Sequence, residues 1–357
     1  MSAQSTESRP GNQVVRHLLE TLRRHPKRVV FTEGEDIRVL EAAARLVREE
    51  VVAPILLGNR EKIRALAADH DIPLTFIKLI DPPLASDFGL FCQRVENMDR
   101  YRTKQLGKAD DLVARPHYFG SLMVQYGQAD AIVGGNQAMP ASFFRALLHM
   151  IKPLPHVPKI FGVTVLIGPH LSNLGSSGIL LLADTGLIPT PDIRELATIA
   201  VETGKLAQHF LGRNPLVALL SHSTKGSAGT PDAKRVEAAT ALALEMARTQ
   251  YLEIGIEGEI QADVALDPSA AEVKLTAAQA RGTADVLVFP NLDAAHISLK
   301  LLQHVAGAQN YGQIILGLAR PAAQVPRTAT AETIFGTAAA VAVEAIKYYE
   351  LYPNADF

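Results

Sequence analysis

Short runs of apolar residues alternate along this chain with longer segments in which apolar residues recur every three or four positions. The short runs are typical of strands buried on both faces, and the longer pattern is typical of amphipathic helices. We predict strands at residues 28–31, 52–57, 129–133, 160–167, 178–183, 216–220, 284–289 and 313–317. We predict helices at residues 36–49, 59–68, 142–150, 191–211, 231–247 and 330–349. This alternation predicts an α/β protein with mostly parallel sheets.

A proline-rich segment divides this pattern into two halves. Residues 152–158 contain three prolines, which neither a helix interior nor a central strand accommodates well. At 357 residues the chain is also long for a single core, so two domains are expected. We place one α/β domain at residues 1–157 and 312–357, beginning with a frayed polar tail, and a second α/β domain at residues 158–311.

Small polar residues follow the predicted strand at residues 216–220, in the sequence LVALLSHSTKGS. Ligands of parallel α/β folds bind at the carboxyl ends of strands, and hydroxyl groups, a cation and a flexible glycine suit an oxyanion such as phosphate. The alternative is an ordinary strand-to-helix turn. The candidate substrate-binding residues of this loop are Ser221, Ser223, Thr224, Lys225, Gly226 and Ser227.

Two further strand ends carry candidate ligand groups. Gly134, Gly135 and Asn136 follow the strand at residues 129–133, where the glycines permit a close approach of a ligand to the backbone. Arg320 and Arg327 lie in a loop stiffened by prolines, and arginines bind phosphate in a planar, two-point geometry. The alternative for both arginines is a solvated position.

Clusters of carboxylates have a structural and a functional interpretation. In TEGED, residues 32–36, the carboxylates suit a helix N-terminus, and Asp36 is a candidate N-cap, as are Asn59 and Asn291 for later helices. The sequence EGEIQAD, residues 257–263, has oxygen ligands for a hard cation, but it lacks the regular spacing of a metal motif. We therefore predict no metal site.

Composition narrows the range of partners. The chain has 35 basic and 37 acidic residues, so it has no charge excess that favours nucleic acid or an anionic membrane surface. A single cysteine, Cys92, excludes a disulfide framework and fits the reducing cytoplasm. No apolar stretch is long enough and uninterrupted enough to span a membrane. We expect a cytoplasmic protein that acts on a small polar metabolite, not on nucleic acid or a membrane.

Seven sequence blocks resemble the phosphate acetyl/butyryltransferase family, and they occur in the family's order between about residues 28 and 349. The blocks are TEGED, YFGSLMVQYGQADAIVGGNQ, the helix that contains Arg145, LLSHSTKGS, EGEIQAD, FPNLDAAHISLKLLQ and GLARP. The resemblance implies two α/β domains with a cleft between them, as in isocitrate and isopropylmalate dehydrogenases. It also implies a homodimer, with residues 158–311 as the dimerisation domain.

The activity that the resemblance implies is the reversible transfer of an acyl group between CoA and phosphate. The partners are then acyl-CoA and phosphate, the CoA thiol attacks the acyl phosphate directly in a ternary complex, and no cofactor is needed. Arg145 and Arg327 stand at the positions of family arginines and are the candidate catalytic residues. Residues 134–136, 221 and 223–227 and Arg320 are the expected substrate-binding positions.

The chain departs from the family pattern close to Arg327. Family members usually have a serine immediately before the loop arginine, where this chain has Pro326. The family's aspartate in the following helix corresponds to Thr333, with Glu332 beside it. These departures resemble the C-terminal domain of large bacterial malic enzymes, so the alternative function is a non-catalytic, acyl-CoA-binding regulatory protein.

Overall fold

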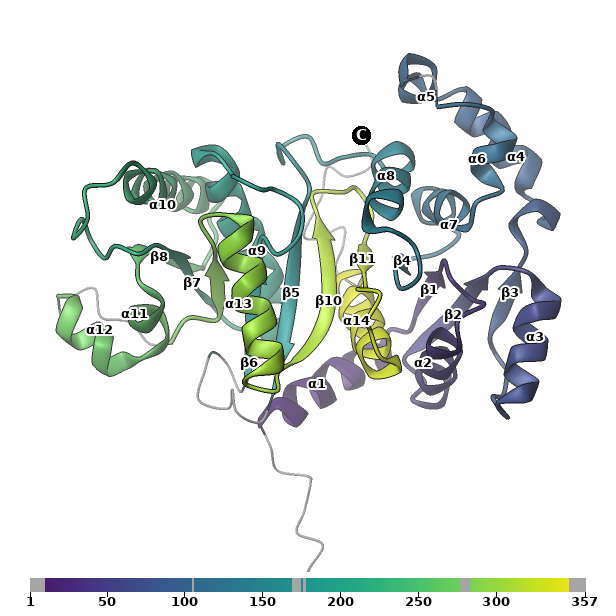
Figure 1. Ribbon diagram of the computed structural model, residues 1–357, viewed down its shortest axis with the longest axis horizontal. Helices are drawn as coiled ribbons and strands as arrows, with labels where there is room; N and C mark the ends of the chain where they lie inside the picture. The colour runs from purple at the N-terminus through teal and green to yellow at the C-terminus, as the bar shows by residue number, and fades with distance from the viewer. Residues whose placement is uncertain (1–9, 105, 169–174, 176–177, 277–282, 347–357) are drawn as a thin grey trace, which may run out of the picture. The chain divides into compact units, whose positions relative to one another are not determined.

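The computed structural model describes residues 10–104, 106–168, 175, 178–276 and 283–346. The chain divides into two compact units, each described here by itself. Unit 1 comprises Met1–His17 and Pro155–Gly317, and unit 2 comprises Leu18–Leu154 and Leu318–Phe357. Both units are α/β, with mostly parallel strands and helices packed on the sheets (Figure 1). The predicted fold class is confirmed.

Unit 2 contains five parallel strands in the order β3-β2-β1-β4-β11. These strands are β1 (Lys27–Phe31), β2 (Val52–Leu57), β3 (Lys78–Ile80), β4 (Ala131–Gly134) and β11 (Ala322–Gln324). The ends of β1, β4 and β11 are therefore neighbours, although 102 residues separate Glu33 from Gly135 in the sequence.

Two groups of helices cover the sheet of unit 2. Helices α2 (Ile37–Arg48) and α14 (Ala331–Glu344) pack on each other, and helices α7 (Pro116–Gln125) and α8 (Pro140–Met150) form a second pair. Both pairs contact strands of the sheet, which explains why the last three residues of β1 and all of β4 are buried. The remaining elements are α3 (Arg60–Asp69), η2 (Pro82–Leu84), α4 (Phe88–Glu96), α5 (Asp99–Lys104) and α6 (Ala109–Val113).

Unit 1 contains six strands in the order β10-β5-β6-β9-β7-β8. The strands β5 (Phe161–Ile167) and β6 (Ile179–Ala183) pair antiparallel, and β10 (Gln309–Leu316) adds to β5 in antiparallel orientation. The strands β7 (Leu216–Leu220), β8 (Gly255–Ile260) and β9 (Val286–Val288) are parallel.

Long helices flank this second sheet. Helices α9 (Ile193–Leu211) and α10 (Pro231–Thr249) pack together, and α11 (Ala262–Leu266), α12 (Pro268–Lys274) and α13 (Leu292–His304) complete the unit. Residues of α11, α12 and α13 share one apolar cluster with the strands. No helix within the described ranges is long and apolar enough to cross a membrane.

Several details of the elements differ from the sequence prediction. Helix α1 (Pro10–Arg24) begins inside the segment that we expected to be a frayed tail, and no elements were assigned where β3, η2, α4 to α7, α11, α12 and β11 lie. Strand β11 lies within the segment that we predicted to be a loop carrying Arg320 and Arg327. The unit boundaries fall after residues 154 and 317 instead of 157 and 311. Antiparallel pairing of β10 with β5 is the reason that residues 312–317 belong to unit 1. The last predicted helical residues, 347–349, lie outside the described ranges.

The predicted helix caps are confirmed. Asp36 accepts a hydrogen bond from the backbone N–H of Arg38, and Asn59 accepts bonds from two N–H groups at the start of α3. Asn291 caps α13 through Ala294. Side-chain oxygens at these positions satisfy N–H groups that have no partner within the helix, so local sequence alone locates the three helix starts.

Candidate functional site

A single carboxylate organises the loop that follows β4. Glu33 lies just after β1 and is only 9% exposed. Its Oε2 accepts hydrogen bonds from the backbone N–H groups of Gly135 and Asn136, at 2.8 and 3.1 Å. Its Oε1 accepts bonds from those of Gln137 and Ala138, at 3.2 and 3.0 Å. Four consecutive N–H groups thus form a cradle for an anion, and the protein fills this cradle with its own side chain.

Asp36 extends this network. Its Oδ2 accepts hydrogen bonds from Asn136 Nδ2 at 2.9 Å and from Gln137 Nε2 at 3.1 Å. The Arg38 guanidinium binds both Asp36 oxygens, with a shortest distance of 2.6 Å. Burial disfavours the charged carboxylate, but the Arg38 bonds and the Asn136 amide outweigh it and lower the pKa of Asp36.

Arg38 also fixes the loop that contains Arg327. Its Nη1 donates to the carbonyl oxygens of Arg327 and Ala329, at 2.8 and 2.7 Å, and its Nη2 donates to the carbonyl of Asn136 at 3.1 Å. One guanidinium therefore joins the loop after β4 to the loop after β11. The backbone of Arg327 is held in place while its side chain is exposed.

We expect the ion pair of Asp36 and Arg38 to contribute to the stability of the fold at neutral pH and to be lost in acid. The lowered pKa means that this pair stabilises the fold fully above the ordinary aspartate value of 3.8 and is lost as the pH falls through the folded-state value. Asparagine is an equally good N-cap, so Asp36→Asn removes the charge and keeps the helix start. We expect the variant to melt at a lower temperature than the wild type at pH 7, with the gap narrowing towards pH 3. Thermal denaturation between these pH values measures this gap, and a constant gap contradicts the prediction.

The glycine pair packs against the protein's own atoms. A Cβ on Gly134 would lie 2.2 Å from Thr32 Oγ1 and 2.6 Å from the Phe143 ring. Gly135 has a φ of +97°, and its Cβ would lie 2.9 Å from the Gln324 side chain. Packing and backbone conformation thus account for both glycines without a ligand. Asn136 is likewise buried, with its amide bound to Asp36.

The two arginines predicted to be catalytic are both in unit 2 and are exposed. Arg145 lies in α8, and Arg327 lies between β11 and α14. Within the described part of the chain, neither guanidinium has a hydrogen-bond or ion-pair partner, so both are available to an anion. Arg320 is half-buried and donates to the carbonyl of Ala319 at 3.0 Å.

The positions that depart from the family pattern have structural roles at the start of α14. Pro326 accepts a turn hydrogen bond from the N–H of Ala329. The Thr333 N–H binds the Thr330 side chain, which caps the helix, and Glu332 forms an ion pair with Arg45. Neither Pro326 nor Thr333 has a group that exchanges a proton near neutral pH.

Sequence analysis did not identify His117, which lies in the first turn of α7 directly before the YFG block. Its ring meets the Phe143 ring edge-on, with centroids 5.6 Å apart. Its Nδ1 is buried without a hydrogen-bond partner among the described residues. Burial lowers the pKa of His117, and the nearby charge of Glu33 opposes this only in part. A lone histidine preceding a recognised block was the available signal.

In unit 1, the hydroxyl loop after β7 bonds largely to itself. Ser223 is fully buried, and its Oγ accepts a hydrogen bond from the Ala228 N–H at 2.9 Å. The Ser227 Oγ accepts one from the Thr224 N–H at 3.0 Å, and the Ser221 Oγ accepts one from the Ser223 N–H at 3.2 Å. The loop is a rigid turn, in which Ser221 and Ser227 retain the most exposed hydroxyl groups.

Two glutamates of β8 engage the rest of this loop. Lys225 forms an ion pair with Glu257 and donates to the carbonyl of Gly258. The buried Glu259 carboxylate accepts the N–H of Gly226, at 3.1 and 3.2 Å to its two oxygens. Two of the three carboxylates of EGEIQAD thus bind the loop after β7, and the third, Asp263, pairs with Lys274. Among the residues that are described, no cluster of three or more His, Cys, Asp or Glu side chains forms a metal site.

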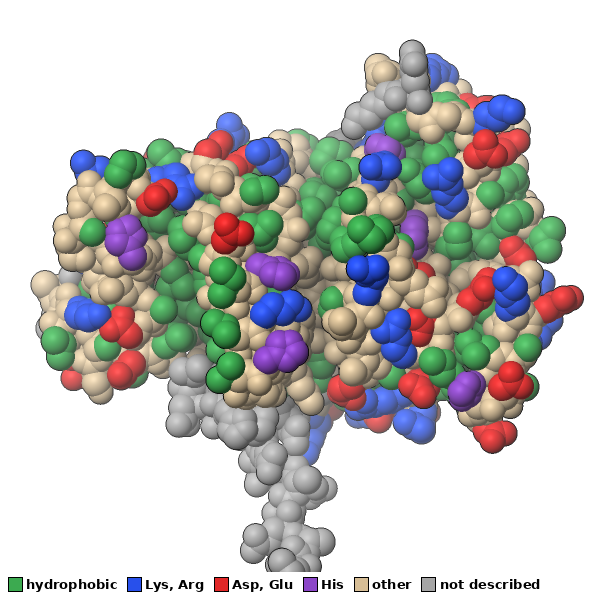
Figure 2. All heavy atoms as spheres, in the orientation of Figure 1, with side chains coloured by type: hydrophobic (Ala, Val, Ile, Leu, Met, Phe, Trp, Pro, Cys, Tyr) green, Lys and Arg blue, Asp and Glu red, His purple; other side chains and the backbone are tan. Residues whose placement is uncertain are grey.

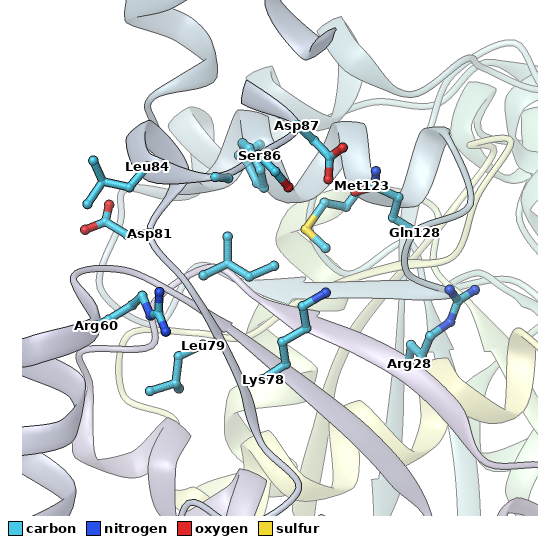
Figure 3. A pocket seen from close by; sticks show the side chains of 13 residues that line it. Arg28, Arg60, Lys78, Leu79, Asp81, Leu84, Ser86, Asp87, Met123 and Gln128 are labelled. Carbon is cyan, nitrogen blue, oxygen red and sulfur yellow. The ribbon is translucent and has the colours of Figure 1, made fainter. Parts of the chain in front are cut away.

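Unit 2 also has a hollow of about 470 Å³ beside β3 and α7 (Figure 3). Arg28, Arg60 and Lys78 line it together with Asp81 and Asp87. Apolar side chains such as Phe119 and Met123 form part of its lining. Because charges of both signs are present, the hollow favours no single class of charged ligand.

Comparisons with known proteins agree with these features. A family model described as phosphate acetyl/butaryl transferase matches residues 13–342. A phosphate acetyltransferase from Staphylococcus epidermidis is 36% identical over 326 residues, which are 90% of this chain and 95% of the relative.

Solved structures show the same similarity. The EutD phosphotransacetylase from Staphylococcus aureus superposes with a TM-score of 0.83 at 33% identity, over 94% of this chain and 99% of that one. A protein from Salmonella typhimurium assigned as a 4-hydroxythreonine-4-phosphate dehydrogenase has a TM-score of 0.52 at 15% identity, over 90% and 99% of the two chains, which shows the dehydrogenase-like fold alone. The chain belongs to the phosphate acetyl/butaryl transferase family.

Proposed function

We propose that this protein is an acyl-CoA:phosphate acyltransferase that converts a short-chain acyl-CoA and phosphate into an acyl phosphate and CoA. Membership of the family, over most of the chain, is the observation that carries the proposal. In the reverse direction the CoA thiol attacks the acyl phosphate directly within a ternary complex. No covalent acyl-enzyme and no cofactor take part, so the protein contributes orientation and charge stabilisation.

Arg145 and Arg327 are proposed to bind the phosphate group. Their exposed guanidinium groups have no competing partner among the described residues, and arginine suits phosphate through paired, charge-assisted hydrogen bonds. The bonds from Arg38 hold the backbone of Arg327, which supports a fixed position for its side chain. Such preorganisation reduces the ordering that ligand binding would otherwise require.

For unit 1 we propose that the loop of Ser221, Ser223, Thr224, Lys225, Gly226 and Ser227 contacts the CoA substrate. The hydroxyl groups of Ser221, which is half-buried, and Ser227, which is exposed, are the best donors for such a contact. The side chains of Ser223 and Thr224 stabilise the loop by accepting backbone hydrogen bonds. Lys225 stabilises it through the ion pair with Glu257. Gly134, Gly135, Asn136 and Arg320 are proposed to line the phosphate site of unit 2, the glycines through their close packing and Asn136 through its bond to Asp36.

The regulatory alternative is not favoured, because the relatives that match over nearly the whole chain are named as acetyltransferases.

We also propose a cytoplasmic homodimer in which unit 1 supplies the contact. Exposed apolar side chains at Ile297 and Leu301 of α13 and at Val305, its C-cap residue, follow each other at four-residue intervals. Figure 2 shows hydrophobic side chains along one side of this helix, and such a stripe suits a helix that packs on a second copy.

The proposed reaction is tested with purified protein, a series of acyl-CoAs and inorganic phosphate. We expect CoA release that requires phosphate and yields an equal amount of acyl phosphate. A thiol reagent measures CoA, and hydroxylamine trapping measures acyl phosphate. Binding of acyl-CoA with no phosphate-dependent release for any acyl chain would support the regulatory alternative instead.

A further inference from the structure

The carboxylates near the Arg327 loop are already engaged by other groups. Glu33 accepts four backbone N–H groups, Asp36 is bound by Arg38 and Asn136, and Glu332 pairs with Arg45. The oxygens of these carboxylates thus already accept hydrogen bonds from groups of the protein. The attack of the CoA thiol requires loss of its proton, so a group other than these carboxylates is needed to accept it.

His117 has the properties that these carboxylates lack. It lies in the first turn of α7, its ring packs on Phe143 of α8, and the charge of Glu33 acts on it. Within the described part of the chain, its buried Nδ1 has no hydrogen-bond partner, and the residue as a whole is only half-buried. The imidazole is therefore not committed to a structural contact through that nitrogen.

The charged groups around His117 are few. Glu33, after β1, is the one whose charge acts on the imidazole. Arg145 and His149 face the same helix from α8, where they interact with Tyr118, and Arg115 precedes the helix. Burial lowers the pKa of His117 more than Glu33 raises it, so the ring is neutral at pH 7 and has an unprotonated nitrogen.

We propose that His117 accepts the proton of the CoA thiol, with Glu33 as the negative charge that stabilises the imidazolium. This inference rests on the proposed acyltransferase function. A ring nitrogen of His117 takes the S–H proton, and the thiolate attacks the carbonyl carbon of the acyl phosphate. The bond between that carbon and the phosphate oxygen then breaks, phosphate leaves with the electron pair, and the imidazolium returns its proton to phosphate or solvent. In the opposite direction the same ring protonates the departing thiolate.

The pH dependence of His117→Gln separates a proton acceptor from a structural residue. With acetyl phosphate and CoA as substrates, we expect kcat/KM for CoA to fall roughly 10²-fold at pH 7. Near pH 9 a CoA thiol with an ordinary pKa of about 8.5 is largely ionised without help, so the loss should shrink several-fold there. His149→Gln removes a neighbouring imidazole of the same unit and should retain the wild-type profile.

The wild-type enzyme provides a test that does not depend on folding of the variant. Its kcat/KM for CoA should rise with pH on the acid side and level off below the ordinary histidine pKa of 6.5. Absence of this rise overturns the proposal, as does a folded His117→Gln variant whose rate is unchanged or reduced equally at every pH. A wild-type protein that releases no CoA from any acyl-CoA removes the proposed function itself, and this inference with it.

Discussion

Replacing Glu33 by alanine is expected to lower the free energy of unfolding by about 3 kcal/mol or more, because buried N–H groups that lose an anionic acceptor each cost about 1–3 kcal/mol. Four such groups, from Gly135 to Ala138, converge on this carboxylate. Water entering the space left by the side chain would recover part of the loss. Urea denaturation measures the change as a lower midpoint with an unchanged slope.

The Glu33→Gln variant tests whether both carboxylate oxygens are needed to accept the four N–H groups. Each oxygen accepts two N–H groups, so an amide would direct its NH₂ group at two donors. We expect Glu33→Gln to be destabilised, but less than Glu33→Ala. The loop would also lose its defined conformation, and acyl transfer should fall in both variants.

Glu35→Ala is the matched control for these variants. Glu35 lies two residues away, accepts one N–H from Asn59 and pairs with Lys62 at 3.5 Å, and its side chain is 38% exposed. Exposed pairs of this kind contribute about 0–1 kcal/mol. Equal destabilisation of Glu33→Ala and Glu35→Ala would show that the four N–H groups are satisfied by solvent when Glu33 is absent.

The sequence predicted the strands and caps well because both depend on local chemistry. Apolar runs such as residues 216–220 and side chains such as Asp36 have the same meaning wherever the chain folds. Helices α4 to α7 were not assigned, since they have only five to ten residues and little regular periodicity. Helix α1 was missed because Pro10, its first residue, follows a polar tail.

The sequence indicated which residues could belong to the candidate site, but not which other residues of the protein contact them. The glycines at 134 and 135 suggested room for a ligand, yet Thr32, Phe143 and Gln324 from distant segments fill that room. Lys225 suggested a free cation, yet β8 runs beside β7 and brings Glu257 to it. Such pairings depend on strand order, which short-range patterns do not encode.

Arg327→Ala should produce the largest loss of phosphate use without loss of stability. Among the described residues, the hydrogen bond made by Arg327 is the one that its carbonyl oxygen accepts from Arg38, and alanine retains that carbonyl. If the exposed guanidinium binds phosphate, its charge-assisted bonds are worth about 1.5–3 kcal/mol, which corresponds to a roughly 10- to 10²-fold fall in kcat/KM for phosphate. Steady-state kinetics at varied phosphate, together with thermal denaturation, measure both quantities.

Two further variants establish whether the geometry of Arg327 matters. Arg327→Lys keeps the charge but loses the planar pair of donors, so it should remain impaired, with activity between those of alanine and the wild type. Arg64→Ala removes an exposed arginine from α3 and controls for the net charge of unit 2. If Arg327→Ala has wild-type kinetics, Arg327 does not bind phosphate and is only a solvated loop residue. We expect the melting temperature of Arg327→Ala to stay close to that of the wild type, because the bond from Arg38 to the backbone carbonyl persists. A clear fall in this melting temperature would contradict the prediction.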